Sequence, residues 1–414
     1  MFKDKKYYGE IWLKSNEDEK SFCVLEVCDG QIQLETNLID KLKIYFIDII
    51  YGNFISLGHL TFVNCSIKHS SSGITEARIY KPKYTFISAF HQIEPLKLKI
   101  NEFQVDNSAI VNWVRKMHWY NSIENKLEIE GEIKNVIEIT KKELNLTIVK
   151  STSQTTNHKY FKLENIGFVN FTSKKQLTII ECIECIEVYN KFQKLLHFIY
   201  GKSIQFKYFS FKCLGCSNWS SLYYQDNLSK NNISNFITLD YDSIKDELPK
   251  IVTHWFSDED ISFCADIIIE NLLAVKTSHS RRFTNSYSAF EAYSLKFGKT
   301  VKNSTVEKSL LQHQVIIQQI TNIPYEKLKG YIKKIIRTRK FLVHRTNAND
   351  KCFTEFELLY ISFLLDFVVG IGLLSQMEVS HKIINKIIGR AKSTFTDMQA
   401  VNRLLNRNIL DSIQ

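Results

Sequence analysis

"YEKLKGYIKKIIRTRKFLVH", residues 325–344, decides the fold of the second half of the chain. When Leu328 is placed at zero on a helical wheel and each residue advances by about 100°, the apolar residues gather near one line. The residues within about 40° of that line are Leu328, Ile332, Ile335 and Leu342. This spacing predicts an amphipathic α-helix with one face turned toward a hydrophobic core.

One cation breaks the pattern of this helix. Arg339 falls at about 20° on the same wheel, in the centre of the apolar stripe, whereas Lys333, Arg337 and Lys340 lie between about 120° and 180°, where cations are solvated. A buried guanidinium is costly unless a carboxylate, a phosphate or a solvated cleft receives it. The sequence therefore predicts a partner for Arg339. An ion pair that only stabilises the fold, and a slightly displaced helix, are the alternatives.

His344 comes where the polar run "RTNAND" ends the helix. The negative partial charge of a helix C-terminus favours an imidazolium, so a capping role is one interpretation. The pairing with Arg339 favours chemistry, because arginine binds a phosphodiester through two hydrogen bonds and histidine exchanges protons near neutral pH. Such a pair is suited to metal-free cleavage of RNA, in which the 2′-hydroxyl, absent from DNA, attacks the adjacent phosphate.

The first half of the chain alternates with period two. "CVLEVCDGQIQLET" gives two strand-like runs around Asp29-Gly30, a strong hairpin signal, and "KLEIEGEIKNVIEIT" and "ELNLTIVK" continue the pattern. From about residue 246 the period changes to that of a helix. Since 414 residues also exceed the usual size of one core, we predict an α+β protein of two domains. They are a β-rich domain over residues 1–235 and an all-α helical bundle over residues 246–414.

The second half contains several helical segments. We predict a long loop or domain boundary in the Asn- and Ser-rich run 217–235 that precedes them. Five main helices follow, and a shorter basic one lies in "KIINKIIGRAK", residues 382–392. The main helices are expected at residues 261–276, 281–298, 306–320, 325–344 and from Glu355 onward.

One of these helices has the apolar character of a membrane span. It lies in "LLYISFLLDFVVGIGLLSQM", residues 358–377, but Asp366 sits in its middle and the uninterrupted apolar run is short for a bilayer, which requires about 20 residues. We predict a buried core helix in which Gly370 and Gly372 allow close packing, and we expect no membrane association.

Composition narrows the class of function. The net charge of +10 favours polyanionic partners such as nucleic acid. The start "MFKDKKYYGEIWL" has charges where a signal peptide needs apolar residues, and nine cysteines without a secretory signal indicate reduced thiols, so we expect a cytoplasmic protein. The phosphate-binding motifs G-x-x-x-x-G-K-[ST] and G-x-G-x-x-G are absent from the sequence, which removes the usual support for nucleotide hydrolysis or dinucleotide chemistry.

Two cysteine pairs leave a metal site open. "CIEC" and "CLGC" place Cys182, Cys185, Cys213 and Cys216 as two CxxC motifs, which would suit tetrahedral zinc. Their separation is longer than in a zinc ribbon, so cysteines without metal are the expectation and structural zinc is the alternative. We expect no other cofactor.

The C-terminal motif resembles that of a known family. "RKFLVH" fits the R-x(4–6)-H signature of HEPN domains, and "LPKIVTHWFS", "SAFEAYSLKFG" and the long apolar helix in their order resemble the HEPN domain of the ApeA antiphage defence proteins. The first half resembles the ApeA N-terminal domain in "YYGEIWL", "GNFISLGHLTFVNCSI", "FQVDNSAIVNWV" and "VYNKFQKLLHFIYGKSI". Together the two resemblances cover nearly the whole chain.

The resemblance implies a cytoplasmic abortive-infection ribonuclease. Arg339 and His344 would be catalytic, Glu291 would face the arginine, and the active site would form in a homodimer or higher homo-oligomer that needs no metal. The β-rich domain would sense a trigger, for example a phage protein. HEPN nucleases often carry Asn, Asp or His after the motif arginine, whereas this chain has Lys340, which could contact phosphate. The alternatives are a non-catalytic HEPN module that dimerises and binds RNA or protein, and a zinc-bearing nucleic-acid adaptor.

Overall fold

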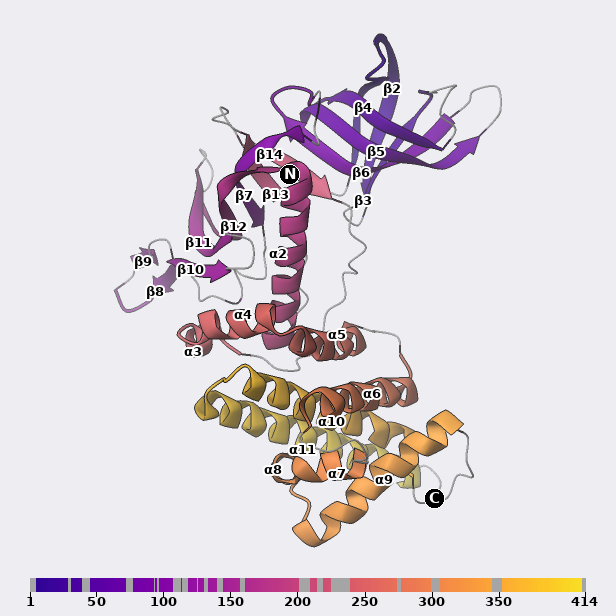
Figure 1. Cartoon of the computed structure of the whole chain (residues 1–414), viewed down its shortest axis with the longest axis vertical. Coiled ribbons are helices and arrows are strands. Elements are labelled where there is room, and N and C mark those ends of the chain that lie inside the picture. Colours follow the sequence, from indigo (N-terminus) through magenta and orange to yellow (C-terminus); the bar gives the residue numbers. More distant parts are fainter. Residues whose placement is uncertain are drawn as a thin grey trace. The chain divides into compact units, whose positions relative to one another are not determined.

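The computed structural model contains two compact units, one β-rich and one helical, which confirms the α+β prediction (Figure 1). The structure describes residues 5–28, 31–38, 45–71, 77–92, 94, 97–106, 113, 118–124, 126–129, 133–139, 144–156, 161–200, 209–213, 219–224, 239–273, 277–298, 306–344 and 352–411. The β-rich unit comprises residues 1–112, 116–189 and 205–229, and the helical unit comprises residues 113–115, 190–204 and 230–414. The division falls within helix α2 (Ile179–Tyr200).

The first six strands of the β-rich unit close into a ring. In this ring the strands follow the order β6-β3-β2-β1-β4-β5, and β5 pairs back to β6. Their bounds are β1 Lys6–Leu13, β2 Asn16–Cys28, β3 Gln31–Thr36, β4 Phe46–Phe54, β5 Gly58–Ser71 and β6 Ala77–Ser88. All the pairs in the ring are antiparallel, so short connections suffice between the strands. Because β5 pairs with β6, the ring is closed and has no free edge.

The hairpin predicted around residues 29–30 is present as a pair of strands. β2 and β3 pair with Cys28 opposite Gln31, so two residues connect them; the connecting residues themselves lie outside the described part. Along β2 the residues Cys23, Leu25 and Val27 are buried. This alternation is what a strand with one face on a core requires.

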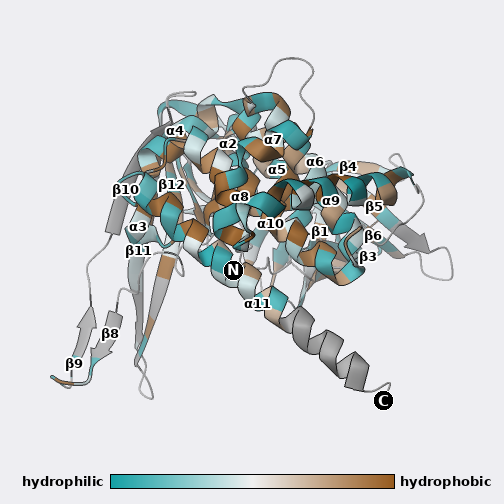
Figure 2. Ribbon diagram, turned by 90° about the horizontal axis from the view of Figure 1, so that it is seen from below, coloured by the Kyte–Doolittle hydropathy of each residue, from teal (hydrophilic) through white to brown (hydrophobic). Residues whose placement is uncertain are grey.

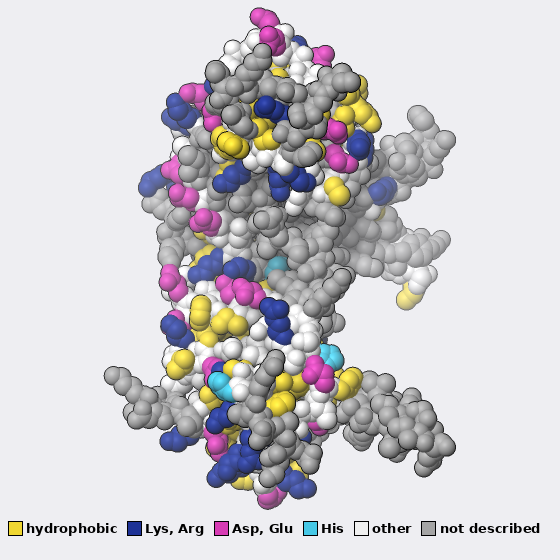
Figure 3. Space-filling model, turned by 90° about the vertical axis from the view of Figure 1, so that its right-hand side faces the viewer, with side chains coloured by type: hydrophobic (Ala, Val, Ile, Leu, Met, Phe, Trp, Pro, Cys, Tyr) yellow, Lys and Arg dark blue, Asp and Glu magenta, His cyan; other side chains and the backbone are white. Residues whose placement is uncertain are grey.

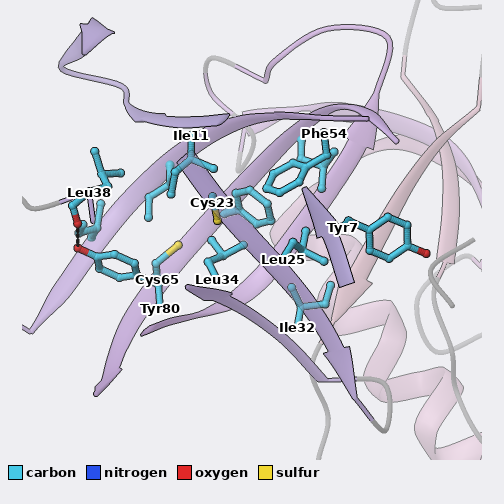
Figure 4. Close-up of a cluster of buried hydrophobic side chains, with 14 of the residues drawn as sticks. Tyr7, Ile11, Cys23, Leu25, Ile32, Leu34, Leu38, Phe54, Cys65 and Tyr80 are labelled. Carbon is cyan, nitrogen blue, oxygen red and sulfur yellow. Dashed lines mark hydrogen bonds between the residues drawn. The ribbon is translucent and has the colours of Figure 1, made fainter. Parts of the chain in front are cut away.

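The interior of the ring is a hydrophobic cluster (Figure 4). Tyr80 donates a hydrogen bond from its hydroxyl to the carbonyl of Leu38 at 2.8 Å, so its polar end is satisfied inside the core. Cys23 and Cys65 are free thiols in the same cluster, and burial raises the pKa of both. The other members labelled in Figure 4 are Tyr7, Ile11, Leu25, Ile32, Leu34 and Phe54.

The remaining strands extend the sheet from β6. The order is β6-β14-β13-β7-β12-β11-β10, with a separate hairpin of β8 and β9. Their bounds are β7 Lys99–Asp106, β8 His118–Asn121, β9 Lys126–Ile129, β10 Ile133–Ile139, β11 Leu144–Thr156, β12 Phe161–Thr178, β13 Phe209–Cys213 and β14 Ser220–Tyr224.

The prediction of a loop over residues 217–235 is wrong for residues 220–224. These residues form β14, which pairs with β13 and β6. Leu222 and Tyr223 are buried, so tertiary packing overrides the polar serines that favoured a loop. Residues 225–235 lie outside the described part.

The second unit is built from helices that carry hydrophobic and hydrophilic residues side by side (Figure 2). Their bounds are α3 Tyr241–Ile244, α4 Leu248–Ser257, α5 Glu259–Leu273, α6 His279–Phe297, α7 Val306–Gln312, α8 Gln314–Thr321, α9 Tyr325–His344, α10 Glu355–Gln376 and α11 His381–Asp411.

Two helix predictions need correction. The segment 306–320 is predicted as one helix, but it divides into α7 and α8 at His313, whose φ and ψ of −95° and 12° are not helical. Two short helices can each turn their buried residues to the core, here Leu310 and Ile317. The short basic helix predicted at 382–392 is part of the 31-residue α11.

Helix α10 is the core of this unit, as predicted. It is the one helix in the described part of the chain that is long and apolar enough to cross a membrane, and 89% of its apolar window is buried inside the protein. A capping box between Thr354 and Glu357 starts it. A Cβ at Gly372 would collide with the ring and hydroxyl of Tyr293 on α6, so glycine is required for this close approach.

Candidate functional site

Helix α9 positions the residues that the sequence singled out. Leu328, Ile332 and Ile335 are buried as the wheel predicted, and Lys333, Arg337 and Lys340 are exposed, also as predicted. Toward its C-terminal end the buried face rotates. Thr338 is the buried residue there, while Leu342 is only half-buried.

Arg339 lies at the edge of the buried face rather than in its centre. Its side chain is 27% exposed, and its Nη2 lies 3.5 Å from Oε2 of Glu291, which is 32% exposed. Glu291 comes from α6, so the ion pair joins two helices of the same unit. The structure thus brings the arginine and the carboxylate named from the sequence together at a site that solvent and ligands can reach.

An aromatic ring supports the guanidinium from a second direction. The Cζ atom of Arg339 lies 5.5 Å from the ring centroid of Tyr287, a distance at which a cation is attracted to the ring face. Tyr287 is buried, and it precedes Glu291 by one helical turn, so both contact the arginine from the same face of α6. Burial, with a contribution from Glu291, raises the pKa of Tyr287 to about 12, so the phenol is neutral at physiological pH.

The guanidinium keeps hydrogen-bonding capacity for a ligand. Nε of Arg339 is buried and has no hydrogen-bond partner among the described residues. Arginine has five N–H donors, and the contact with Glu291 at 3.5 Å is longer than a well-formed charged hydrogen bond. The buried Nε is closed to a ligand, so an anion with two oxygens, such as a phosphodiester, would bind the terminal N–H groups of the part-exposed guanidinium.

The C-terminal end of α9 is fixed beside the arginine. Thr338 donates a hydrogen bond from Oγ1 to the carbonyl of Lys334 at 2.8 Å and accepts one from the amide of Phe353 at 3.1 Å. The Nζ atom of Lys334 lies 4.2 Å from the ring centroid of Phe353 and 3.7 Å from Oε2 of Glu357. These contacts set the rotation of the helix at the residue directly before Arg339.

His344 and Lys340 are exposed on the same helix. His344 is the last residue of α9, in agreement with its predicted place in the final turn. The exposure of both side chains leaves them accessible to a substrate or to a second copy of the chain. The residues that follow, 345–351, lie outside the described part.

The four cysteines of the alternative zinc site can be followed only in part. Cys182 and Cys185 are buried on α2, in its portion within the β-rich unit. The side chain of Cys213 and the whole of Cys216 lie outside the described part. Among the described residues there is no group of three or more His, Cys, Asp or Glu side chains arranged to hold a metal ion. Zinc at these four cysteines stays the alternative to cysteines without metal.

Sequence reasoning missed two residues at this site. Tyr287 could have been found, because it lies four residues before Glu291 and therefore on the same helical face. Thr338 could not, since its partner is the backbone of Phe353, fifteen residues away across a connection.

One comparison with known proteins identifies the family. The model of the ApeA N-terminal domain 1 matches residues 6–255, which is more than half of the chain. The chain therefore belongs to the ApeA family, as the resemblance predicted, and membership indicates a role in antiphage defence. No curated protein matches the chain, and no solved structure does. The match ends within α4, before the helices that carry Glu291 and Arg339.

Proposed function

We propose that the helical unit is a HEPN domain and that the chain is a metal-independent endoribonuclease of antiphage defence. The observation that carries this proposal is the position of Arg339. Its guanidinium is held by Glu291 and Tyr287, it is part-exposed, and it lies five residues before an exposed His344 on one helix. That arrangement combines an anchored anion-binding group with a group that transfers protons near neutral pH.

The proposed reaction uses the 2′-hydroxyl of RNA as the nucleophile. The bond from the 2′-oxygen to phosphorus forms and the bond from phosphorus to the 5′-oxygen breaks. His344 exchanges the protons that leave the 2′-hydroxyl and enter the 5′-oxygen, and Arg339 stabilises the charge on the phosphate oxygens. Glu291 orients Arg339, and Lys340 contributes a further positive charge. The products are a 2′,3′-cyclic phosphate and a 5′-hydroxyl.

A dimer would complete the site. Arg339 and His344 lie about 140° apart around α9, so one copy presents them on different faces of the helix. A second copy at the exposed end of α9 can bring an arginine and a histidine to the same phosphate. In this proposal the protein is cytoplasmic, works without a membrane and forms a homodimer or higher homo-oligomer. The β-rich unit restrains the nuclease until it meets a trigger such as a phage protein.

One observation favours a second candidate function. The ion pair between Arg339 and Glu291 joins α6 and α9 within one chain, so it can also serve a purely structural role. The domain would then be a non-catalytic module that dimerises and binds RNA or a protein, and Lys340 after the motif arginine is in keeping with that. The two functions differ in what the loss of His344 does.

A phage challenge in cells separates them. Cells that carry the wild-type chain, Arg339→Ala, His344→Ala or the surface control Lys327→Ala are infected, and survival, intact RNA and protein levels are followed. The nuclease proposal requires protection by wild type and Lys327→Ala and its loss in both motif variants at equal protein levels. Protection by the His344→Ala variant equal to that by wild type would reject catalysis and favour the binding module.

A further inference from the structure

Helix α9 carries a row of exposed basic side chains on the face opposite its core contacts. With Lys329 at zero, Lys333, Arg337, Lys340 and His344 all fall within about 80° on one side of the helix. All five side chains are exposed. Successive members are three or four residues apart, so they recur about every 5 to 6 Å along the helix axis. We call Lys329, Lys333, Arg337 and Lys340 the α9 stripe.

The cations of the stripe differ from other lysines of the same unit. Lys194, Lys250 and Lys296 each form an ion pair, with Asp266 at 2.7 Å, Glu378 at 2.5 Å and Asp260 at 2.6 Å respectively. Within the described part of the chain, no member of the stripe forms an ion pair with a carboxylate. In Figure 3, lysine and arginine side chains gather at the lower end of the molecule, where Figure 1 shows α9.

A groove adjoins the N-terminal end of the stripe. It has a volume of about 570 Å³ and lies between α7, α8 and the first turns of α9. Lys329 belongs to both the stripe and the groove, and Tyr325, 62% exposed, stands at its wall. The other polar residues that line it are Lys308, Gln312, Gln314 and Glu326.

The chemistry of the groove suits a nucleobase better than a phosphate. An exposed tyrosine ring offers a stacking surface, and the two glutamine amides can donate to and accept from base edges. Leu311 and Leu328 give the groove an apolar lining that a base can contact. The carboxylate of Glu326 offsets part of the positive charge of the two lysines there and can accept a hydrogen bond from an exocyclic amine. The stripe beside it, by contrast, offers only positive charge.

We propose that the α9 stripe and this groove bind the RNA substrate as a single strand and direct it to His344. Phosphates lie along the stripe, and an unpaired base lies in the groove against Tyr325. The charge complementarity, the regular spacing and the continuity of the stripe with His344 select this occupant. A duplex would keep its bases stacked and could not fill the groove. The inference rests on the proposed nuclease function and specifies which form of RNA the site accepts.

The test measures binding separately from cleavage. The full-length His344→Ala chain is titrated with a fluorescein-labelled 20-nucleotide single-stranded RNA at several salt concentrations. Adding Lys333→Gln with Arg337→Gln is expected to weaken binding roughly tenfold and to lower the slope of log K against log salt by about 0.7 for each phosphate that the protein no longer neutralises. Tyr325→Ala is expected to weaken the binding of single-stranded RNA, while the weaker binding of duplex RNA stays unchanged.

Lys327→Gln is the matched control. It is an exposed lysine of the same helix, but it lies about 160° around the helix from Lys329, outside the stripe. If the Lys333→Gln, Arg337→Gln chain binds RNA as tightly as this control, with the same salt slope, the inference is overturned. The test distinguishes a failure of the proposed nuclease function from a failure of the proposed RNA-binding surface. RNA binding that depends on the stripe in a chain that never cleaves RNA would reject the nuclease and keep the binding surface.

Discussion

Arg339 and Glu291 form an ion pair between α9 and α6, with Nη2 and Oε2 separated by 3.5 Å. Each side chain is exposed over about a third of its surface, and such pairs contribute at most about 1 kcal/mol to stability. The pair therefore orients a guanidinium more than it holds the fold together. A variant that breaks the ion pair should therefore change the rate of RNA cleavage more than the free energy of unfolding.

Neutralising the carboxylate should affect activity more than stability. In Glu291→Gln the side chain keeps its shape but loses its charge, so Arg339 is oriented less well and RNA cleavage should slow on the order of tenfold. The free energy of unfolding should change by less than about 1 kcal/mol. Cleavage rates and urea unfolding check both values.

Glu270→Gln, at an exposed carboxylate of α5, is the control for this variant and should leave both quantities unchanged. A Glu291→Gln chain that cleaves RNA at the wild-type rate would show that the ion pair has no part in orienting Arg339.

The ring of Tyr287 should matter more than its hydroxyl. Tyr287→Phe keeps the face over which Arg339 lies, so cleavage should stay within about twofold of wild type. Tyr287→Leu removes that face and should lower kcat more than it raises KM. Steady-state kinetics on folded protein measure the two effects. Equal cleavage rates for the Phe and Leu variants would show that the ring of Tyr287 does not support Arg339 in catalysis.

The hydroxyl of Thr338 should contribute measurably to the free energy of unfolding. Thr338→Val keeps the shape but leaves the buried amide of Phe353 without its acceptor, which should cost about 1 to 3 kcal/mol. Thr338→Ser keeps the acceptor and should lose less. Urea unfolding of both variants tests this, and a valine variant as stable as the serine variant would contradict it.

Asp366 should make the stability of the protein depend on pH. This carboxyl on α10 is fully buried, and Nδ2 of Asn271 lies 3.4 Å from its Oδ2. Burial raises its pKa to about 7, against the opposing effects of Arg282 and of hydrogen bonds from Ser286 and Asn271. The folded state therefore holds a proton that the unfolded state releases, so stability should fall as the pH rises from about 4 to about 7.

The variant Asp366→Asn cannot titrate at this position and should lack that part of the pH dependence. The measurement is the free energy of unfolding of both proteins at several pH values across the window. If the difference between them is the same at every pH, the burial of Asp366 does not raise its pKa.

Much of the fold could be predicted because periodicity reports burial. The alternation in β2, the apolar spacing in α9 and the near-continuous apolar run of α10 each follow from one buried face or a fully buried helix. The break at His313 and the strand β14 could not be predicted. β14 depends on its pairing with β6, and the His313 ring at the break contacts the rings of Phe290 and Tyr293 on α6. Both sets of partners lie far away in the sequence.

The site was predictable in its residues but only partly in its geometry. The helical wheel identified Arg339 as the cation that needs a partner, and Glu291 lies beside it. The wheel assumes a straight cylinder with a uniform environment, so it placed Arg339 in the centre of the apolar face. In the folded protein, the contact of Thr338 with Phe353 fixes which face is covered, and Arg339 is left at the edge.

The most direct test of the central claim is the chemistry of the RNA ends. Protein purified from phage-infected cells is incubated with single-stranded RNA in EDTA, and the products are analysed by mass spectrometry. The wild-type protein should give 2′,3′-cyclic phosphate and 5′-hydroxyl ends and should not cleave where the nucleotide at the cut is 2′-deoxy, and the His344→Ala variant should give no products. Products with 5′-phosphate ends, or cleavage that persists in the His344→Ala variant, would contradict the central claim.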